Sequence, residues 1–194
     1  TYLRWTEFAT FSPIMRFHGV TPREPWAYSR YAVSVYKFYA WLRENLLKYS
    51  VHTAEEAHKT GIPMMRPLPM VFPEDKEAVY WEDEYFYGSD LLVAPVHQEG
   101  EKRRIYFPSG SWINLLDFRK MVGGNRIFQV DVPIDKIPVY IREGACILSV
   151  MNGELQLGQS MTYEKKNTVL MSRALNETSG KRYADGKEIE YNIL

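Results

Sequence analysis

The stretch Thr1–Gly19, TYLRWTEFATFSPIMRFHG, carries the residues on which the fold assignment depends. Its first half repeats large apolar side chains at intervals of three and four, the period of one helical face: Leu3, Trp5, Phe8 and Phe11. The second half opens with a proline, which predicts a turn at Ser12-Pro13. An apolar run follows and ends in Arg-Phe-His-Gly, so we expect a short buried strand up to Gly19.

Arg16 and His18 are the first candidates for contact with a ligand. Side chains alternate along a strand, so these two would share one face, with Met15 and Phe17 on the other. A guanidinium offers a rigid fork of donors and an imidazole can donate or accept, which suits an anion or a ligand with several hydroxyls. Taken alone, each residue is more readily explained by a structural role.

The order of residues in this stretch carries more information than the single residues do. Arg4-Trp5, Phe11-Ser12-Pro13 and Arg16-Phe17-His18-Gly19 follow one another, and Pro22–Trp26, PREPW, comes next. The stretch resembles the corresponding segment of glycoside hydrolase family 31, the α-glucosidases and α-xylosidases. The PREPW part is more similar to the bacterial and archaeal α-xylosidase-type members than to the animal α-glucosidases.

Composition excludes some classes of partner. The 194 residues contain 24 Lys and Arg and 24 Asp and Glu, so no charge excess favours nucleic acid or an anionic membrane. No apolar run approaches the ~18 residues of a membrane span, and the first residues do not look like a signal peptide. The chain opens in mid-helix without a methionine, as a fragment of a longer protein would. The single cysteine, Cys146, is expected to be a buried small apolar residue.

The pattern of the chain changes near Gly61. Before it, an apolar stripe predicts a long helix that starts at Pro25 or Trp26, and a second helix runs over Leu46–Thr60. After it, short runs between turn residues predict an antiparallel sandwich. The expected strands are Met64–Phe72, Asp90–Val96, Arg104–Phe107, Trp112–Leu116, Ile127–Val132 and Pro138–Leu148.

The later segments also resemble family 31 in order. The matching runs are Gly61–Leu68, Tyr85–Val96, Tyr106–Trp112 and Ile137–Ala145, whereas beyond Val150 only Tyr183–Gly186 and Tyr191 are similar. The resemblance implies an α/β plus all-β fold in three parts. Residues 1–61 would be the C-terminal part of a (β/α)8 barrel, residues 62–150 a β-sandwich, and residues 151–194 part of a further β-domain. Asn176–Thr178 matches a glycosylation sequon by pattern alone.

The two carboxyl groups of a retaining glycosidase, about 5 to 5.5 Å apart, are not found in this sequence. Trp81–Glu84, WEDE, is only superficially similar to the family's nucleophile motif, and we interpret it as a solvated acidic turn. The resemblance implies that both catalytic aspartates lie upstream of Thr1, so we assign no catalytic residue. It also implies that His18 bonds hydroxyls of the sugar beside the scissile bond, with a weaker substrate-binding role for Arg16.

No cofactor is implied, because the acid, base and nucleophile of this chemistry are all side chains. His52 and His58 are six residues apart on one helix, whereas helical metal pairs need three or four, so no metal site is expected. The expected partners are an oligosaccharide substrate and the remainder of the barrel. Homo-oligomers and the compartment stay open, with the cytoplasm slightly favoured. The alternative is a non-catalytic carbohydrate-binding or interaction β-domain, which would have no reason to carry Arg4–Gly19.

Overall fold

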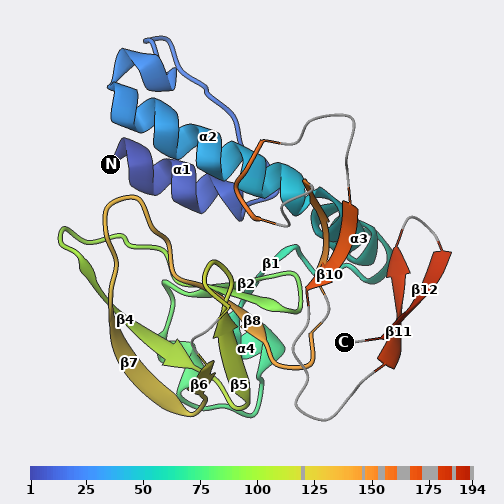
Figure 1. The fold of residues 1–194 in the computed structure, drawn as a ribbon. Helices are drawn as coiled ribbons and strands as arrows, with labels where there is room; N and C mark the ends of the chain where they lie inside the picture. The colour runs from blue at the N-terminus through green and yellow to red at the C-terminus, as the bar shows by residue number, and fades with distance from the viewer. Residues whose placement is uncertain are drawn as a thin grey trace.

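The fold is seen in a computed structural model that describes residues 1–118, 121–145, 147–152, 156–160, 167–171, 179–184 and 187–192. Helices gather in one layer, and most of the strands lie below it (Figure 1). Cys146 and Asn176–Thr178 lie outside the described residues. None of the described helices is long and apolar enough to cross a membrane.

The helical layer consists of α1 (Tyr2–Thr10), α2 (Arg30–Asn45) and α3 (Leu47–Thr60). A short 3-10 turn, η1 (Pro25–Ala27), precedes α2. The predicted long helix therefore begins later than Pro25 or Trp26. The reason is local, since Ser29 is extended and its hydroxyl accepts the Ala32 N–H, which caps α2 at Arg30.

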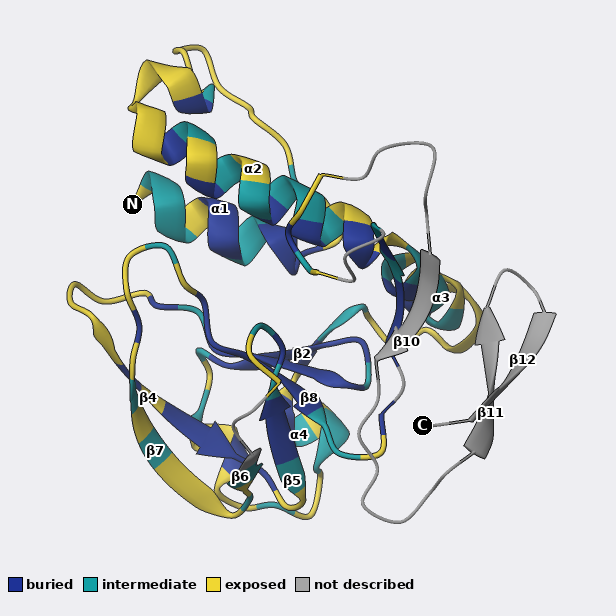
Figure 2. Cartoon of the chain, in the orientation of Figure 1, coloured by how far each residue is buried: buried dark blue, intermediate teal, exposed yellow. Residues whose placement is uncertain are grey.

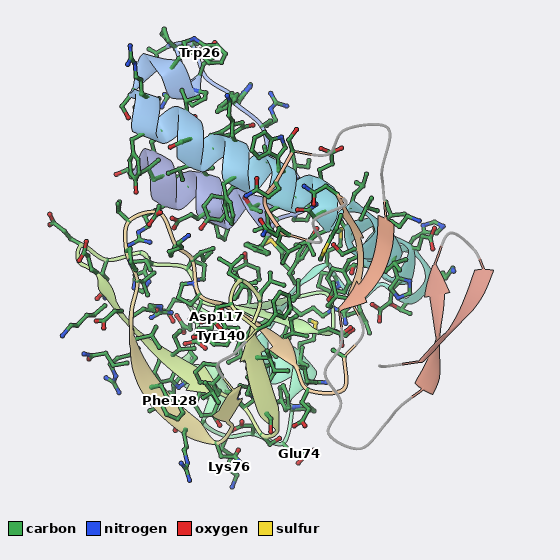
Figure 3. All side chains as sticks on the ribbon, viewed as in Figure 1. Trp26, Glu74, Lys76, Asp117, Phe128 and Tyr140 are labelled. Atoms are coloured by element: carbon green, nitrogen blue, oxygen red, sulfur yellow. The ribbon has the colours of Figure 1, made fainter. Side chains whose placement is uncertain are left out.

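Helix α3 ends at Thr60, before Gly61, as predicted. Gly61 adopts a left-handed conformation, with φ 77°, and its N–H bonds the Ala57 carbonyl, as glycine does at many helix C-termini. The apolar stripe of α2 is buried from Ala32 onward, whereas Tyr28 and Tyr31 are about half exposed. Trp26 projects at the far tip of the helical layer (Figure 3).

A six-stranded antiparallel sheet forms the centre of the strand region, in the order β1-β2-β3-β8-β5-β6. These strands are β1 (Met65–Pro67), β2 (Tyr85–Tyr87), β3 (Leu91–Val93), β8 (Val139–Arg142), β5 (Ser111–Asn114) and β6 (Met121–Gly123). A separate ribbon pairs β4 (Lys102–Phe107) with β7 (Arg126–Asp131). The antiparallel arrangement expected for this part of the chain is confirmed.

Two further strand pairs and two short helical turns complete the described elements. Strand β9 (Ile147–Met151) pairs with β10 (Asn167–Met171), and β11 (Ser179–Ala184) pairs with β12 (Lys187–Asn192). Two short turns of helix, α4 (Leu68–Val71) and η2 (Ala78–Tyr80), lie between β1 and β2.

The central sheet is covered on both faces, which explains its long apolar runs. Along β2 and β3, Tyr85, Tyr87, Leu91 and Val93 belong to the cluster that includes the α2 and α3 side chains. The alternate residues of these strands and of β8, such as Tyr140, instead join a second cluster with β4. Figure 2 shows this dark band of buried residues between the helices and the ribbon, and Figure 3 marks Tyr140 on β8 and Phe128 on the ribbon. The strands of a sheet that is buried on both faces have continuous runs of hydrophobic residues rather than an alternating pattern.

Some predicted elements differ from the structure. The expected strand Met64–Phe72 ends at Pro67, because Leu68–Val71 forms a helical turn with proline in its first turn. The expected strand Pro138–Leu148 divides into β8 and the start of β9, because Gly144 turns the chain with φ 77°. Of the predicted apolar stripe, Phe11 is fully buried and Leu3 and Phe8 pack against the core, but Trp5 is 62% exposed and Glu7 is buried instead.

Candidate functional site

The segment that carries Arg16 and His18 does not form the buried strand that the sequence predicts. The turn at Ser12-Pro13 is present, but Ile14–His18 has no regular secondary structure and Ile14 is 71% exposed. A strand requires a hydrogen-bonded neighbour, and the part of the chain that the structure describes places no strand beside this segment. The segment therefore makes no strand ladder.

Arg16 and His18 nevertheless lie together, as alternation predicts. Both side chains are exposed, and Nη2 of Arg16 contacts Nδ1 of His18. Since a guanidinium only donates, Nδ1 acts as the acceptor, and a neutral imidazole then carries its proton on Nε2. The pair thus presents an Nε2–H donor and the remaining guanidinium donors to a ligand.

A hollow of about 440 Å³ adjoins this pair. The lining residues come from α1, from residues 14–18, from the turn that follows them and from α2. They are Thr1, Tyr2, Trp5, Thr6, Ala9, Met15, Arg16, Phe17, His18, Arg23, Tyr28 and Tyr36. No aspartate or glutamate is among them. Its charge comes from arginines, so the hollow offers donors and aromatic faces but no carboxylate that could act as an acid or a nucleophile.

Aromatic rings hold the middle of the segment and line the same hollow as Arg16 and His18. The ring of Phe17 lies 4.6 Å from that of Tyr36 and 6.4 Å from that of Tyr2, centroid to centroid. Tyr2 in turn stacks on Tyr28 at 4.0 Å. Burial raises the pKa of the Tyr2 hydroxyl to about 12, with smaller contributions from the neighbouring Tyr36 and Tyr28. The hydroxyl is therefore neutral at physiological pH.

Hydrogen bonds from distant residues hold the start of the segment. Nη1 of Arg43, on α2, donates to the carbonyls of Ala9, Thr10 and Ser12 at 3.2, 2.9 and 2.6 Å, and Nη2 donates to Pro13 at 2.7 Å. From β2, the hydroxyl of Tyr85 donates to the Phe11 carbonyl at 3.0 Å. Sequence reasoning did not identify Arg43 or assign Tyr85 a role, because no local pattern marks a contact with so distant a partner.

Gly19 closes the segment in a backbone conformation that residues with a side chain rarely adopt. A Cβ there would lie 2.8 Å from Nε of Arg23, and the φ of Gly19 is 153°. The guanidinium of Arg23 packs against this glycine and also lines the hollow. The glycine therefore lets the chain turn back beside the ligand-facing side chains.

The acidic run Trp81–Glu84 lies elsewhere, and the interpretation as a solvated turn is wrong for Glu84. This side chain is 1% exposed, and its Oε1 accepts the Tyr106 N–H at 3.0 Å. Burial raises its pKa to about 8, although Arg103 and this N–H act in the opposite direction. Asp83 pairs with Arg103 at 2.9 Å. None of these acids lines the hollow beside His18.

The described residues offer no obvious metal centre. Nowhere among them do three His, Cys, Asp or Glu side chains form a group that could hold a metal ion. His52 and His58 both lie on α3, away from the residues that line the hollow. The site is thus built from an imidazole, arginines, aromatic rings and backbone.

Comparison with known protein families decides the assignment. Residues 1–53 match the model of the glycosyl hydrolases family 31 TIM-barrel domain, and residues 61–147 match that of the family 31 C-terminal domain. The chain belongs to glycoside hydrolase family 31. The resemblance seen in the sequence is confirmed, and so is the fold class, the end of a (β/α)8 barrel followed by antiparallel β-structure.

The family 31 relatives include hydrolases and transferases. The chain is 34% identical over 171 residues to an isomaltosyltransferase of Sporosarcina globispora, which covers 81% of this chain and 16% of that protein. It is 34% identical over 149 residues to an α-xylosidase of Saccharolobus solfataricus, covering 75% and 20%. The chain therefore spans about a fifth of the length of these relatives.

Solved structures of family 31 enzymes superpose on most of the chain. The cycloalternan-forming enzyme of Listeria monocytogenes, in complex with a pentasaccharide substrate, matches with a TM-score of 0.89 at 28% identity. That match covers 97% of this chain and 20% of the enzyme. A Flavobacterium johnsoniae dextranase complexed with isomaltotriose matches with a TM-score of 0.81 at 29% identity, over 98% of this chain and 23% of the dextranase.

Proposed function

We propose that this chain is the C-terminal part of a retaining α-glycosidase that hydrolyses terminal α-linked glucose or xylose from oligosaccharides. In this proposal, residues 1–61 complete the catalytic barrel, residues 62–150 form a β-sandwich and residues 151–194 belong to a further β-domain. The two catalytic aspartates come from polypeptide outside these 194 residues. No aspartate or glutamate lines the hollow, which supports a substrate-binding rather than an acid–base role for this part of the enzyme.

His18 is the residue that touches the substrate in this proposal. The single observation that carries it is the exposed contact between Arg16 and His18 at the edge of the hollow, which occupies Nδ1 and leaves Nε2 of the ring as the donor to a ligand. A hydrogen bond to a sugar hydroxyl strengthens as the ring flattens toward an oxocarbenium ion, so it lowers the barrier as well as binding the ground state. Arg16 orients the imidazole and makes a weaker contact of its own.

The substrate class rests on the similar proteins. An isomaltosyltransferase, an α-xylosidase, an α-glucosidase and a 1,6-α-glucosyltransferase are among them, and the last three carry the α-linkage in their names. The PREPW run after Gly19 favours the α-xylosidase type. The 194-residue chain by itself is expected to be inactive.

The test is His18→Ala in the full-length enzyme, assayed with p-nitrophenyl α-D-glucopyranoside and α-D-xylopyranoside. We expect a loss of about 2 to 4 kcal/mol of transition-state stabilisation, roughly 30- to 900-fold in kcat/KM. The control is His58→Ala, an exposed histidine on α3, which should leave kcat/KM unchanged. Unchanged kcat/KM in folded His18→Ala would remove the proposed role of this residue.

A further inference from the structure

The C-terminal end of α1 continues into the site segment, residues 11–19, which carries Arg16 and His18. The backbone carbonyls at this junction accept hydrogen bonds from side chains of other parts of the chain. Arg43 reaches four carbonyls between Ala9 and Pro13, and the segment continues directly from the last of these to His18. A helix C-terminus exposes carbonyls with partial negative charge, which a cation in the right place stabilises. Arg43 supplies such a cation from α2.

The chemistry of the contact requires a guanidinium. Two nitrogens of one planar group bond carbonyls on both sides of the turn, Nη1 up to Ser12 and Nη2 to Pro13. A lysine ammonium is a single point of donation and cannot span these carbonyls in the same geometry.

Tyr85 adds a contact from the strand region. Its hydroxyl bonds the Phe11 carbonyl, and its ring packs edge-on against Phe8 of α1 at 5.9 Å. The residue is buried, so this hydrogen bond is shielded from water. The backbone of Phe11–Pro13 is thus held from α2 on one side and from β2 on the other.

Beyond Pro13 the segment has few other constraints in the described chain. Ile14–His18 joins no strand, and its lateral contacts include the rings around Phe17 and a 3.8 Å contact from the Thr10 hydroxyl to the sulfur of Met15. Five residues span at most about 17 Å of chain. A small displacement at Pro13 is therefore carried forward to the imidazole.

We infer that Arg43 and Tyr85 are positioning residues for the sugar-binding site, which act by fixing the backbone of Phe11–Pro13 and hence the place of His18. This inference rests on the proposed function, because it assigns a catalytic consequence to contacts that otherwise only cap a helix. A purely structural role would lower stability and leave catalysis by the folded enzyme unchanged. A positioning role lowers kcat/KM at temperatures where the variants are fully folded.

The chain offers a matched control for each residue. Arg66 is a buried arginine that bonds the Pro63 carbonyl and Glu56, and neither it nor those partners line the hollow. Tyr87 lies two residues from Tyr85 on the same strand, and its hydroxyl bonds Ser50. Arg66→Gln and Tyr87→Phe thus remove the same chemical groups as Arg43→Gln and Tyr85→Phe without touching the site segment.

The experiment compares these four variants in the full-length enzyme, with the two p-nitrophenyl glycosides as substrates. We expect Arg43→Gln to lower kcat/KM at least 10-fold and Tyr85→Phe about 3-fold, whereas Arg66→Gln and Tyr87→Phe lower only Tm. Arg43→Lys should recover less than half of the lost activity. Hydrogen exchange should be faster over residues 8–20 in Arg43→Gln and unchanged there in Arg66→Gln.

Two results would overturn the inference. One is unchanged exchange over residues 8–20 in Arg43→Gln, and the other is faster exchange with kcat/KM equal to that of Arg66→Gln. His18→Ala separates this failure from that of the proposed function. Loss of activity in His18→Ala with full activity in Arg43→Gln removes only the positioning role, whereas full activity in both removes the sugar-binding assignment as well.

Discussion

The hydroxyl of Tyr49 occupies the space where the side chain of any residue other than glycine would begin at position 88. A Cβ on Gly88 would lie 2.3 Å from this oxygen, and the φ of Gly88 is 68°. The same hydroxyl donates to the Tyr87 carbonyl at 2.8 Å and accepts the Asp90 N–H at 3.2 Å. One buried tyrosine of α3 therefore closes the turn between β2 and β3 and joins the helices to the sheet.

Gly88→Ala should destabilise the protein by about 3 kcal/mol or more, because it combines a left-handed backbone with a steric overlap. The measurement is the free energy of unfolding in urea. Gly61→Ala is the matched control, since Gly61 has φ 77° but open space around its Cβ position, and it should cost about 1 kcal/mol. Equal losses in the two variants would contradict the steric part of the argument.

Arg4 should contribute strongly to stability because it joins α1 to the loop before β8. Its guanidinium pairs with buried Glu7 at 3.1 Å and donates to the carbonyls of Val132, Pro133 and Lys136. Arg4→Ala leaves these groups without their donor, so we expect a loss of about 3 kcal/mol in urea unfolding. The double variant Arg4→Ala, Glu7→Leu should lose less than the sum of the single variants. Additive losses would show that the pair is not coupled.

Stability should fall as pH rises from about 5 to 8. Burial raises the pKa of Glu7 to about 7, against the opposing effect of Arg4, and burial raises that of Glu84 to about 8. Between the ordinary carboxyl pKa of 4.5 and these values, the folded state binds more protons than the unfolded state, so deprotonation favours unfolding. Urea unfolding at several pH values measures the slope.

Glu84→Gln should flatten this pH dependence, because the amide cannot ionise. Glu74→Gln, at an exposed position that Figure 3 marks at the edge of the strand region, should leave it unchanged. An unaltered slope in Glu84→Gln would mean that Glu84 ionises at its ordinary pKa in the folded protein.

Asn45 should be hard to replace, because its buried amide joins the end of α2 to β9 and to Gly158 beyond it. Nδ2 donates to the Val150 carbonyl at 2.7 Å, and Oδ1 accepts the Gly158 N–H at 2.8 Å. Asn45→Ala leaves both groups unpaired, so we expect a loss of about 2 to 3 kcal/mol. Asn45→Asp keeps the acceptor but sets a carboxylate against a carbonyl, and it should lose at least as much in thermal unfolding. A loss below 0.5 kcal/mol, roughly that of a surface change, would contradict this.

Much of the fold could be predicted from local patterns. The buried stripe of α2 from Ala32 to Leu42, the glycine that ends α3 and most of the strands follow from the spacing of apolar and turn residues. The segment at Ile14–His18 could not be predicted in the same way, because whether an apolar run becomes a strand depends on a neighbour. The burial of Glu7 and Glu84 could not be predicted either, because sequence patterns assign glutamate to the surface whatever its position.

By itself, the sequence determined the family, the succession of helices and then strands, and the common side of Arg16 and His18. These follow from residue order and from backbone periods that act over a few residues. Only the tertiary structure decided that Arg43 and Tyr85 hold the Phe11–Pro13 backbone, across separations of 30 and 74 residues. Such contacts depend on how the helices and the sheet pack together. Packing brings distant residues into contact, and no periodic pattern in the sequence marks these pairs.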